Sequence, residues 1–180
     1  MTSTRFLLAA MVLGTALGTN QANAQGSCIG LGSCNTTNTA SVTVGALVKL
    51  GFSSTSTTLT APDADDLDVG ALIENAGPTF TVKANRSWTL KIKTTEPTNW
   101  QYSGTSSGVK PIGHLAWATS SGGTFTPITA SDATFASGAG ATNSGAASSF
   151  FQTTWVADFA DPSNREGVYS LPIVFTLSAP

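Results

Sequence analysis

The chain has 180 residues, a formal net charge of −2 at pH 7 and a charged fraction of only 10%, where an average soluble domain has about 25%. It carries no cluster of lysine and arginine, which excludes the basic surface that nucleic-acid-binding proteins use. The length is enough for one domain with its own hydrophobic core.

The first 24 residues have the pattern of a secretory signal peptide. Arg5 precedes an apolar run over residues 6–17, and Ala22-Asn23-Ala24 forms an A-x-A cleavage site,. The apolar run is shorter than the roughly 20 residues that a membrane-spanning helix needs. We therefore expect cleavage near Ala24 and a secreted product, periplasmic or at the cell surface, with no membrane span in the mature chain.

Residues 25–40 are predicted to form an N-terminal disulfide loop followed by a polar linker. Cys28 and Cys34 are the only cysteines, and the oxidising environment of an exported protein favours a disulfide between them. Because the loop is short, the bond would contribute about 2 kcal/mol at most. A redox or metal pair is the alternative, although two thiols without a nearby histidine do not complete a four-ligand zinc site.

Residues 41–180 are predicted to form one all-β domain. The segments 79–84 and 88–93 are expected to form a hairpin. Residues 130–149, which are almost all small or polar, are expected to form a long weakly structured loop or a poorly patterned edge. Pro172 interrupts the last strand and is expected at a sheet edge or beside a bulge. Runs with a two-residue apolar period predict strands over 42–52, 79–84, 88–93, 114–120, 151–159 and 168–177,.

Seven or eight short strands without an amphipathic helix are typical of one architecture. We predict an antiparallel immunoglobulin-like β-sandwich, in which alternate side chains of each strand face the core and the others face water. A β-barrel is the less favoured alternative.

The acidic cluster after Pro62 is the candidate metal site. Asp63, Asp65, Asp66 and Asp68 lie within six positions, and Ca²⁺ takes 6–8 oxygen ligands. The cluster does not match the EF-hand loop, because that loop requires glycine at its sixth position and the sixth residue counted from Asp63 is Asp68. A solvated acidic loop is the preferred interpretation and calcium the alternative, and no other cofactor is indicated.

The four tryptophans are candidates for a carbohydrate-binding platform or for the core. Trp88, Trp117 and Trp155 fall on inward-facing positions of predicted strands, which favours core packing. Trp100 lies between two polar amide residues, and we predict that it is partly exposed and offers a binding contact.

The sequence shows no catalytic constellation. Residues 104–108 match the pattern G-x-S-x-G with Ser106 at its centre, but that pattern has a catalytic meaning only on a strand–turn–helix, and no helix is predicted here. His114 is the only histidine, and Asp132 or Asp158 could orient it only if the fold brought them together. We predict that the protein is not an enzyme, with a secreted hydrolase as the alternative.

Two segments resemble the WxL-domain cell-surface proteins. Residues 80–93, with Ser87-Trp88-Thr89-Leu90 at their centre, are similar to the first W-x-L element of that family. Residues 169–180 resemble its closing element, with Phe175 in place of the second tryptophan. Secreted fimbrial subunits of bacteria share the same general appearance. The resemblance implies a cell-surface β-sandwich that adheres without catalysis to an envelope polymer, a glycan or another surface protein.

The leading functional hypothesis is therefore a non-enzymatic secreted or cell-surface β-sandwich with a role in adhesion or surface assembly. The alternative is a polymerising fimbrial or pilus-type subunit, a homo-oligomer in which one copy lends an N-terminal strand to the next.

Overall fold

The computed structural model describes residues 31–35 and 37–179. The chain divides into two units, Met1–Thr43 and Val44–Pro180, and all the helices and strands of the described residues belong to the second. The predicted signal peptide and Cys28 lie outside the described residues. No cysteine within them is free, and the Cys28–Cys34 pairing stays a prediction.

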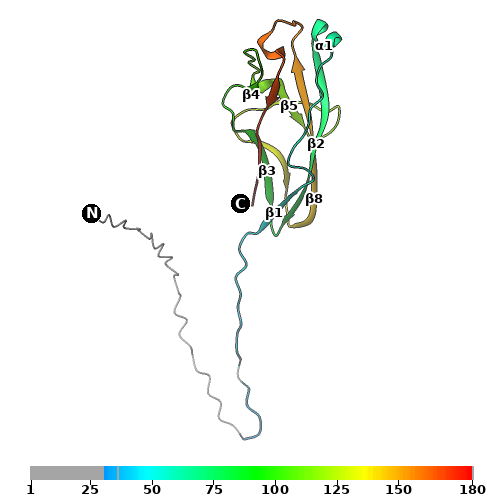
Figure 1. Cartoon of the computed structure of the whole chain (residues 1–180). Coiled ribbons are helices and arrows are strands. Elements are labelled where there is room, and N and C mark those ends of the chain that lie inside the picture. Colours follow the sequence, from blue (N-terminus) through cyan, green and yellow to red (C-terminus); the bar gives the residue numbers. More distant parts are fainter. Residues whose placement is uncertain (1–30, 36, 180) are drawn as a thin grey trace, which may run out of the picture. The chain divides into compact units, whose positions relative to one another are not determined.

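The second unit is built mainly of antiparallel strands (Figure 1), which confirms the all-β prediction. The described residues contain ten strands and three short helices. In chain order these are β1 (Val48–Phe52), α1 (Ala64–Val69), β2 (Ala71–Ala84), β3 (Trp88–Thr94), β4 (Gln101–Ser103), the 3-10 helix η1 (Ile112–His114), β5 (Leu115–Ala118), β6 (Thr126–Pro127), β7 (Ala133–Gly138), β8 (Thr142–Trp155), the 3-10 helix η2 (Pro162–Asn164), β9 (Val168–Ser170) and β10 (Ile173–Ser178).

The strands form three sheets. The largest has the order β1-β2-β8-β5-β6, the second has the order β10-β3-β7, and β4 pairs with β9 in a two-stranded sheet. The 14-residue strands β2 and β8 form the longest ladder, which begins at the pair Ala71–Trp155 and ends at Ala84–Thr142. They lie side by side along the domain (Figure 1).

Aromatic side chains join the five-stranded and three-stranded sheets into one core. The ring centroid of Phe80 on β2 lies 4.4 Å from that of Phe175 on β10 and 5.4 Å from that of Phe135 on β7. Trp117 on β5 lies 5.3 Å from Phe135 by the same measure. Because facing sheets are held by such interdigitating side chains, these contacts fix the two sheets against each other.

The predicted hairpin over residues 79–93 is correct in its burial but wrong in its pairing. β2 lies between β1 and β8, whereas β3 lies between β10 and β7. Residues 85–87 therefore carry the chain from one sheet to the other. Both strands still turn alternate residues toward the shared core, where the side chains of Phe80, Val82, Ala84, Trp88, Leu90 and Ile92 are buried.

Residues 130–149 are mostly strand, which corrects the prediction of a loop. β7 contributes Phe135, which is buried in the core, and β8 is an inner strand of the largest sheet. The small residues of this region make room for Trp88, because a Cβ added at Gly138 would overlap its indole and one at Gly145 would lie 3.2 Å from it. Their lack of bulk is a packing requirement of the core.

The last predicted strand is divided into β9 and β10 at Leu171 and Pro172. β9 pairs with β4, and β10 pairs with β3 as the outer strand of its sheet. The carbonyl of Pro172 accepts a hydrogen bond of 2.8 Å from Thr94 Oγ1. Since proline has no N–H to donate, a break between two strands at a sheet edge suits it.

Candidate functional site

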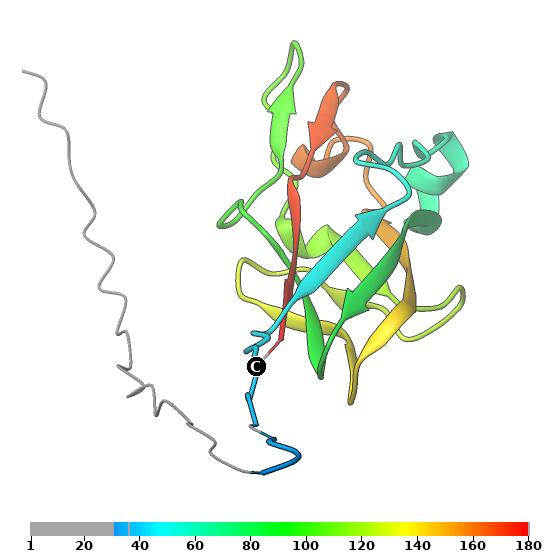
Figure 2. The same cartoon turned by 90° about the horizontal axis from the view of Figure 1, so that it is seen from below.

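A groove of about 970 Å³ opens beside the outer strands of two sheets. β1 is the outer strand of the five-stranded sheet and β10 that of the three-stranded sheet, and Figure 2 shows them next to each other. They meet at Phe52 and Phe175, whose ring centroids are 5.9 Å apart. The groove is lined by the loop after β1 (residues 54–61), by residues 167–173, by Phe175 and by side chains of β5 and β8.

The groove leaves core side chains partly uncovered. Phe52 is 45% exposed, and Leu171, Ile173 and Phe175 are half-buried although they pack against the core. Covering such apolar surface is favourable by about 25 cal/mol per Å². Along one side β10 has no strand partner among the described residues, and an open strand edge offers backbone groups to a further strand. The groove is therefore suited to an apolar segment that adds a strand.

Lys110 is the only charged residue among those that line the groove. Its side chain is 1% exposed, and its Nζ donates a hydrogen bond of 2.7 Å to the carbonyl of Thr154 and lies 3.7 Å from the ring centroid of Trp155. Burial lowers the pKa of Lys110 to about 8, although the negative charge of Asp161 opposes this shift. Backbone hydrogen bonds hold both sides of the lysine, because the N–H of Val109 donates to the carbonyl of Pro162 and the carbonyl of Lys110 accepts from the N–H of Trp100.

Two further polar side chains near Lys110 lack partners. Thr153 Oγ1 and Trp155 Nε1 are buried and make no hydrogen bond in the described structure. Both residues line the groove, and since they are two positions apart on β8 they point to the same face of the sheet. A buried hydroxyl or N–H group without a hydrogen-bond partner lowers the free energy of unfolding by about 1–3 kcal/mol, so each of these two donors destabilises the folded domain.

Trp100 corrects one sequence prediction. It lines the groove, but it is only 8% exposed, and its Nε1 donates a hydrogen bond of 3.1 Å to the carbonyl of Pro111. Trp88 and Trp117 are buried in the core as predicted, and Trp155 is half-buried beside the groove. Of the site's polar residues, Lys110 and Thr153 had no signal in the sequence, because neither stands in a recognisable motif.

The acidic cluster is helical, which corrects the predicted loop. Asp63 is the N-cap of α1, where its Oδ1 accepts a hydrogen bond of 2.9 Å from the backbone N–H of Asp66. In return Asp66 Oδ2 accepts one of 3.0 Å from the N–H of Asp63. Gly70, with a φ of 76°, ends the helix,. This reciprocal pair is a capping box, and it engages two of the four carboxylates that the sequence offered to calcium.

The calcium alternative for the four aspartates stays a prediction. Across residues 31–35 and 37–179, no group of three or more histidine, cysteine, aspartate or glutamate side chains is placed to hold a metal ion. Asp65 and Asp68 are exposed, in keeping with the solvated acidic segment that the sequence favoured.

The cap leads to a testable prediction. Replacing Asp63 with alanine is expected to cost about 1 kcal/mol, which is the usual loss for an N-cap, and to lower Tm by about 2–4 °C. Asp65→Ala, at an exposed position in the same helix, is the matched control and should leave Tm within about 1 °C of the wild type. Thermal unfolding with and without millimolar Ca²⁺ tests the calcium alternative. A bound ion would raise Tm, and we expect no change.

The residues of the hydrolase alternative are not brought together. Ser106 lies in the exposed loop after β4, whereas His114 ends the 3-10 helix η1, and its Nδ1 makes no hydrogen bond to any described residue. Asp132 forms ion pairs with Lys91 and Lys93 at 3.7 and 3.1 Å, and Asp158 accepts a hydrogen bond from the N–H of Ala160.

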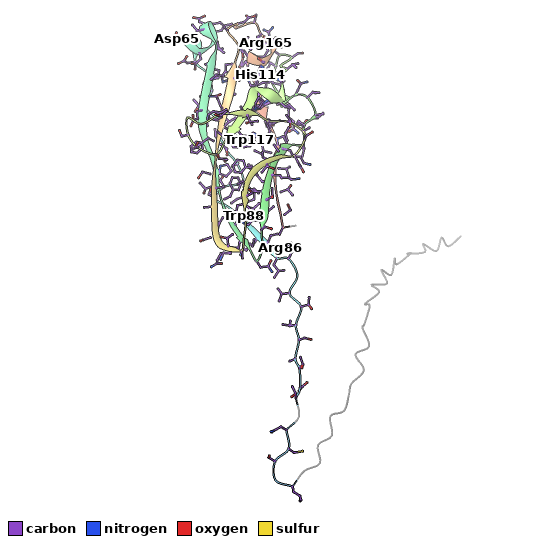
Figure 3. All side chains as sticks on the ribbon, turned by 180° about the vertical axis from the view of Figure 1, so that it is seen from behind. Asp65, Arg86, Trp88, His114, Trp117 and Arg165 are labelled. Carbon is purple, nitrogen blue, oxygen red and sulfur yellow. The ribbon has the colours of Figure 1, made fainter. Side chains whose placement is uncertain are left out.

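His114 lies near Lys110 and shares its surroundings. Burial lowers the pKa of His114, and the positive charge of Lys110 adds to the shift. Its Nδ1 is buried without a partner in the described structure. Figure 3 places it with Asp65 toward one end of the domain, away from Arg86 and Trp88.

No protein-family model matches the chain, and no curated protein matches it in sequence. Within the part that the structure describes, no helix is long and apolar enough to cross a membrane.

Proposed function

We propose that the protein is a non-enzymatic secreted or cell-surface β-sandwich of immunoglobulin-like type that acts in surface assembly. Its groove takes an apolar strand from a second copy of the same chain. The observation that carries the proposal is the open apolar groove, with uncovered core side chains beside an outer strand that has a free edge. Adding a strand to such an edge is a common mode of protein recognition.

The segment before β1 has the properties of the donated strand. Ala40, Val42 and Val44 alternate with hydroxyl residues at positions 39, 41 and 43, which is the period of a strand with one apolar face. Val42 is 88% exposed and Val44 67% exposed. The described part of the chain provides no strand that pairs with them, so the apolar face of this segment is left without a partner.

The anchoring of this segment favours donation to another copy. Asn85 holds it at the start of β1, because its Nδ2 donates to the carbonyl of Gly45 at 2.8 Å and its Oδ1 accepts from the N–H of Leu47 at 2.9 Å. The groove lies at the other end of β1, beside Phe52. The anchor therefore fixes the point from which the segment leaves the domain, and the segment is our candidate for the strand that is donated to a neighbouring molecule.

This arrangement also supports the polymerising fimbrial alternative. The donated segment and the groove are different surfaces, so the contact between two copies is head-to-tail. Contacts of this kind extend into open fibres when no rotation closes them into a ring.

Size-exclusion chromatography with light scattering, together with electron microscopy, tests the proposal. The exported wild-type protein is expected to form oligomers or fibres. The double variant Val42→Asp/Val44→Asp should stay monomeric, because a carboxylate cannot be buried in the groove at low cost. The matched control, Ser41→Asp/Thr43→Asp, places the same charges on the opposite face and should still assemble.

A peptide provides the complementary measurement. A labelled peptide of residues 37–46 is expected to bind the monomeric double variant, because the groove of that variant is intact. A strictly monomeric wild type at high concentration, or a Val42→Asp/Val44→Asp variant that assembles normally, would show that the proposal is wrong.

A further inference from the structure

We propose that two copies of the chain meet through oppositely charged ends, with the basic end of the donating copy against the acidic end of the receiving copy. This inference rests on the strand donation proposed above and adds a second contact to the same assembly. The charged residues of the second unit divide between two ends of the domain. Arg86 lies at one end in Figure 3, and Asp65 and Arg165 lie at the other.

The basic end is the end of the domain at which β1 begins. Its exposed cations are Lys49 on β1, Lys83 on β2 and Arg86 in the link between β2 and β3. Strand pairing and the contacts of Asn85 bring four segments together there, namely residues 44–50, 82–90, 138–145 and 176–179. None of these segments contains aspartate or glutamate, so the charged side chains of the described residues at this end are all positive.

Two of these cations face each other without a negative partner. Lys49 and Lys83 are directly opposite on β1 and β2, so their side chains project from the same face of the sheet. The ion pairs of the described residues are those of Lys91 and Lys93 with Asp132, and neither of the opposed lysines has one. Like charges directly opposite on neighbouring strands destabilise a sheet. A surface of another molecule that carries carboxylates would relieve this repulsion.

The acidic end is the end that carries α1 (Figure 1). Its exposed acidic residues come from α1 with its N-cap and from the segment after β8, and they are Asp63, Asp65, Asp68, Asp158 and Glu166. The two segments lie together, because a Cβ added at Gly70, which ends α1, would be 3.3 Å from the backbone N of Ala157. Arg165 is the single exposed cation of the described residues at this end, so the end as a whole is negative.

Strand donation brings a basic end and an acidic end together. The donated apolar face ends at Val44, and a hydrogen bond fixes Leu47 at the basic end. Three residues span at most about 10 Å, so the basic end of the donor must come close to the groove that receives its strand. That groove is lined by residues 54–61, which precede the N-cap of α1, and by residues 167–173, which follow Glu166. The acidic end therefore borders the receiving groove.

The charged ends are expected to select the orientation in which two copies meet. Complementary potentials accelerate association and disfavour wrong contacts, which here are contacts between two basic ends or between two acidic ends. Such charges act over about 30 Å at 0.01 M salt but over only about 3 Å at 1 M. The apolar strand should therefore provide most of the affinity, and the charged ends a contribution that salt removes.

Charge reversal at each end, followed by mixing, tests the inference. Lys49→Glu/Lys83→Glu makes the basic end negative, and Asp65→Lys/Asp68→Lys places two positive charges on α1. At low salt, each variant alone should need at least about fivefold more protein than the wild type for half-maximal light scattering. An equimolar mixture of the two should assemble nearly as well as the wild type, because each reversed end then meets an end of opposite charge.

Two controls separate the charged contact from net charge and from strand donation. Lys91→Glu/Lys93→Glu changes the net charge by the same amount on β3, where Asp132 holds both lysines, and should assemble like the wild type. The peptide of residues 37–46 has no charged side chain and carries the donated strand without the basic end. Its binding to the monomeric double variant should not weaken between about 0.01 and 1 M NaCl, whereas assembly of the wild type should weaken at least about fivefold.

The stability of the domain distinguishes a contact between copies from a role in the fold. Lys83→Gln removes one side of a repulsive pair, so it should leave the Tm of the monomeric double variant unchanged or higher while it weakens assembly of the otherwise unchanged chain at low salt. A lower Tm would mean that Lys83 supports the fold, and the inference would be wrong.

The inference can fail while strand donation stands. Assembly that responds to neither salt nor charge reversal, but is still abolished by Val42→Asp/Val44→Asp, would overturn the charged contact alone. A mixture of the two reversed variants that assembles no better than either one would do the same. A wild type that stays monomeric would contradict strand donation itself, and the charged contact with it.

Discussion

Replacing Phe80 with alanine is expected to lower the free energy of unfolding by about 3–5 kcal/mol, the usual cost of removing a buried phenylalanine. Phe80 is 2% exposed, and its ring contacts those of Phe135 and Phe175 across the core and that of Phe52 at a centroid distance of 5.1 Å. The cavity would lie between the two sheets, where neither can move without breaking its own ladders. Urea unfolding followed by circular dichroism measures the loss.

Phe52 is the matched control for this prediction. It belongs to the same aromatic cluster but is 45% exposed at the groove. Phe52→Ala therefore removes less buried surface and should cost about 1 kcal/mol. If Phe80→Ala cost no more than Phe52→Ala, Phe80 would not be the link between the sheets that the structure shows.

The alternation of residues 79–93 predicted which side chains are buried, but not which strands pair. Burial follows from the chain alone, because successive side chains of a strand point to opposite faces. Pairing depends on which edges meet, and the short link at residues 85–87 has a length that also suits a hairpin. Here Asn85 holds Gly45 and Leu47 at the start of β1. This contact joins residues 40 positions apart along the chain, so the alternation of residues 79–93 contains no sign of it.

Small residues also prevented the prediction of β7 and of the first part of β8. Residues 130–149 contain one large apolar residue, Phe135, too few to make a two-residue period visible. Two of their glycines, Gly138 and Gly145, face the indole of Trp88. Bulk that is supplied by one strand must be absent from the strand that it packs against. The pattern of a single segment therefore underestimates strands whose partners carry the large side chains.

The candidate site was the least predictable part of the molecule. The polar neighbours of Trp100 suggested exposure, yet its backbone N–H donates to the carbonyl of Lys110 and its indole to that of Pro111. Lys110 is buried by Thr154 and Trp155, 44 and 45 residues further along the chain. Lysine is mostly a surface residue, so the burial of Lys110 could not be predicted from its residue type and became visible only in the folded structure. By contrast, the strand predicted over residues 42–52 is formed only over Val48–Phe52, and the alternating Val42 and Val44 before it have no partner strand among the described residues.

The buried ammonium of Lys110 is expected to make stability rise with pH above about 8. The pKa of this group is about 8 in the folded protein, and the ordinary value for a lysine side chain is 10.5. Between these values the unfolded chain holds a proton that the folded protein has released, so the free energy of unfolding increases with pH. One pKa unit corresponds to about 1.4 kcal/mol, which gives an increase of about 3 kcal/mol at most by pH 10.5. Below pH 8 both states are charged, and Lys110 contributes no slope.

Urea unfolding of the wild type and of Lys110→Met between pH 7 and pH 10.5 tests this expectation. The variant has no group to titrate at this position and should lack the rise. The pKa of Tyr169 is raised by burial and by Tyr102, so ionisation of this tyrosine removes stability near the top of the range in both proteins, and the difference between them isolates Lys110. Asp161 and His114, whose pKa values are both lowered, are deprotonated in the folded protein throughout this range. Parallel curves for the two proteins would mean that the ammonium of Lys110 is solvated in the folded protein.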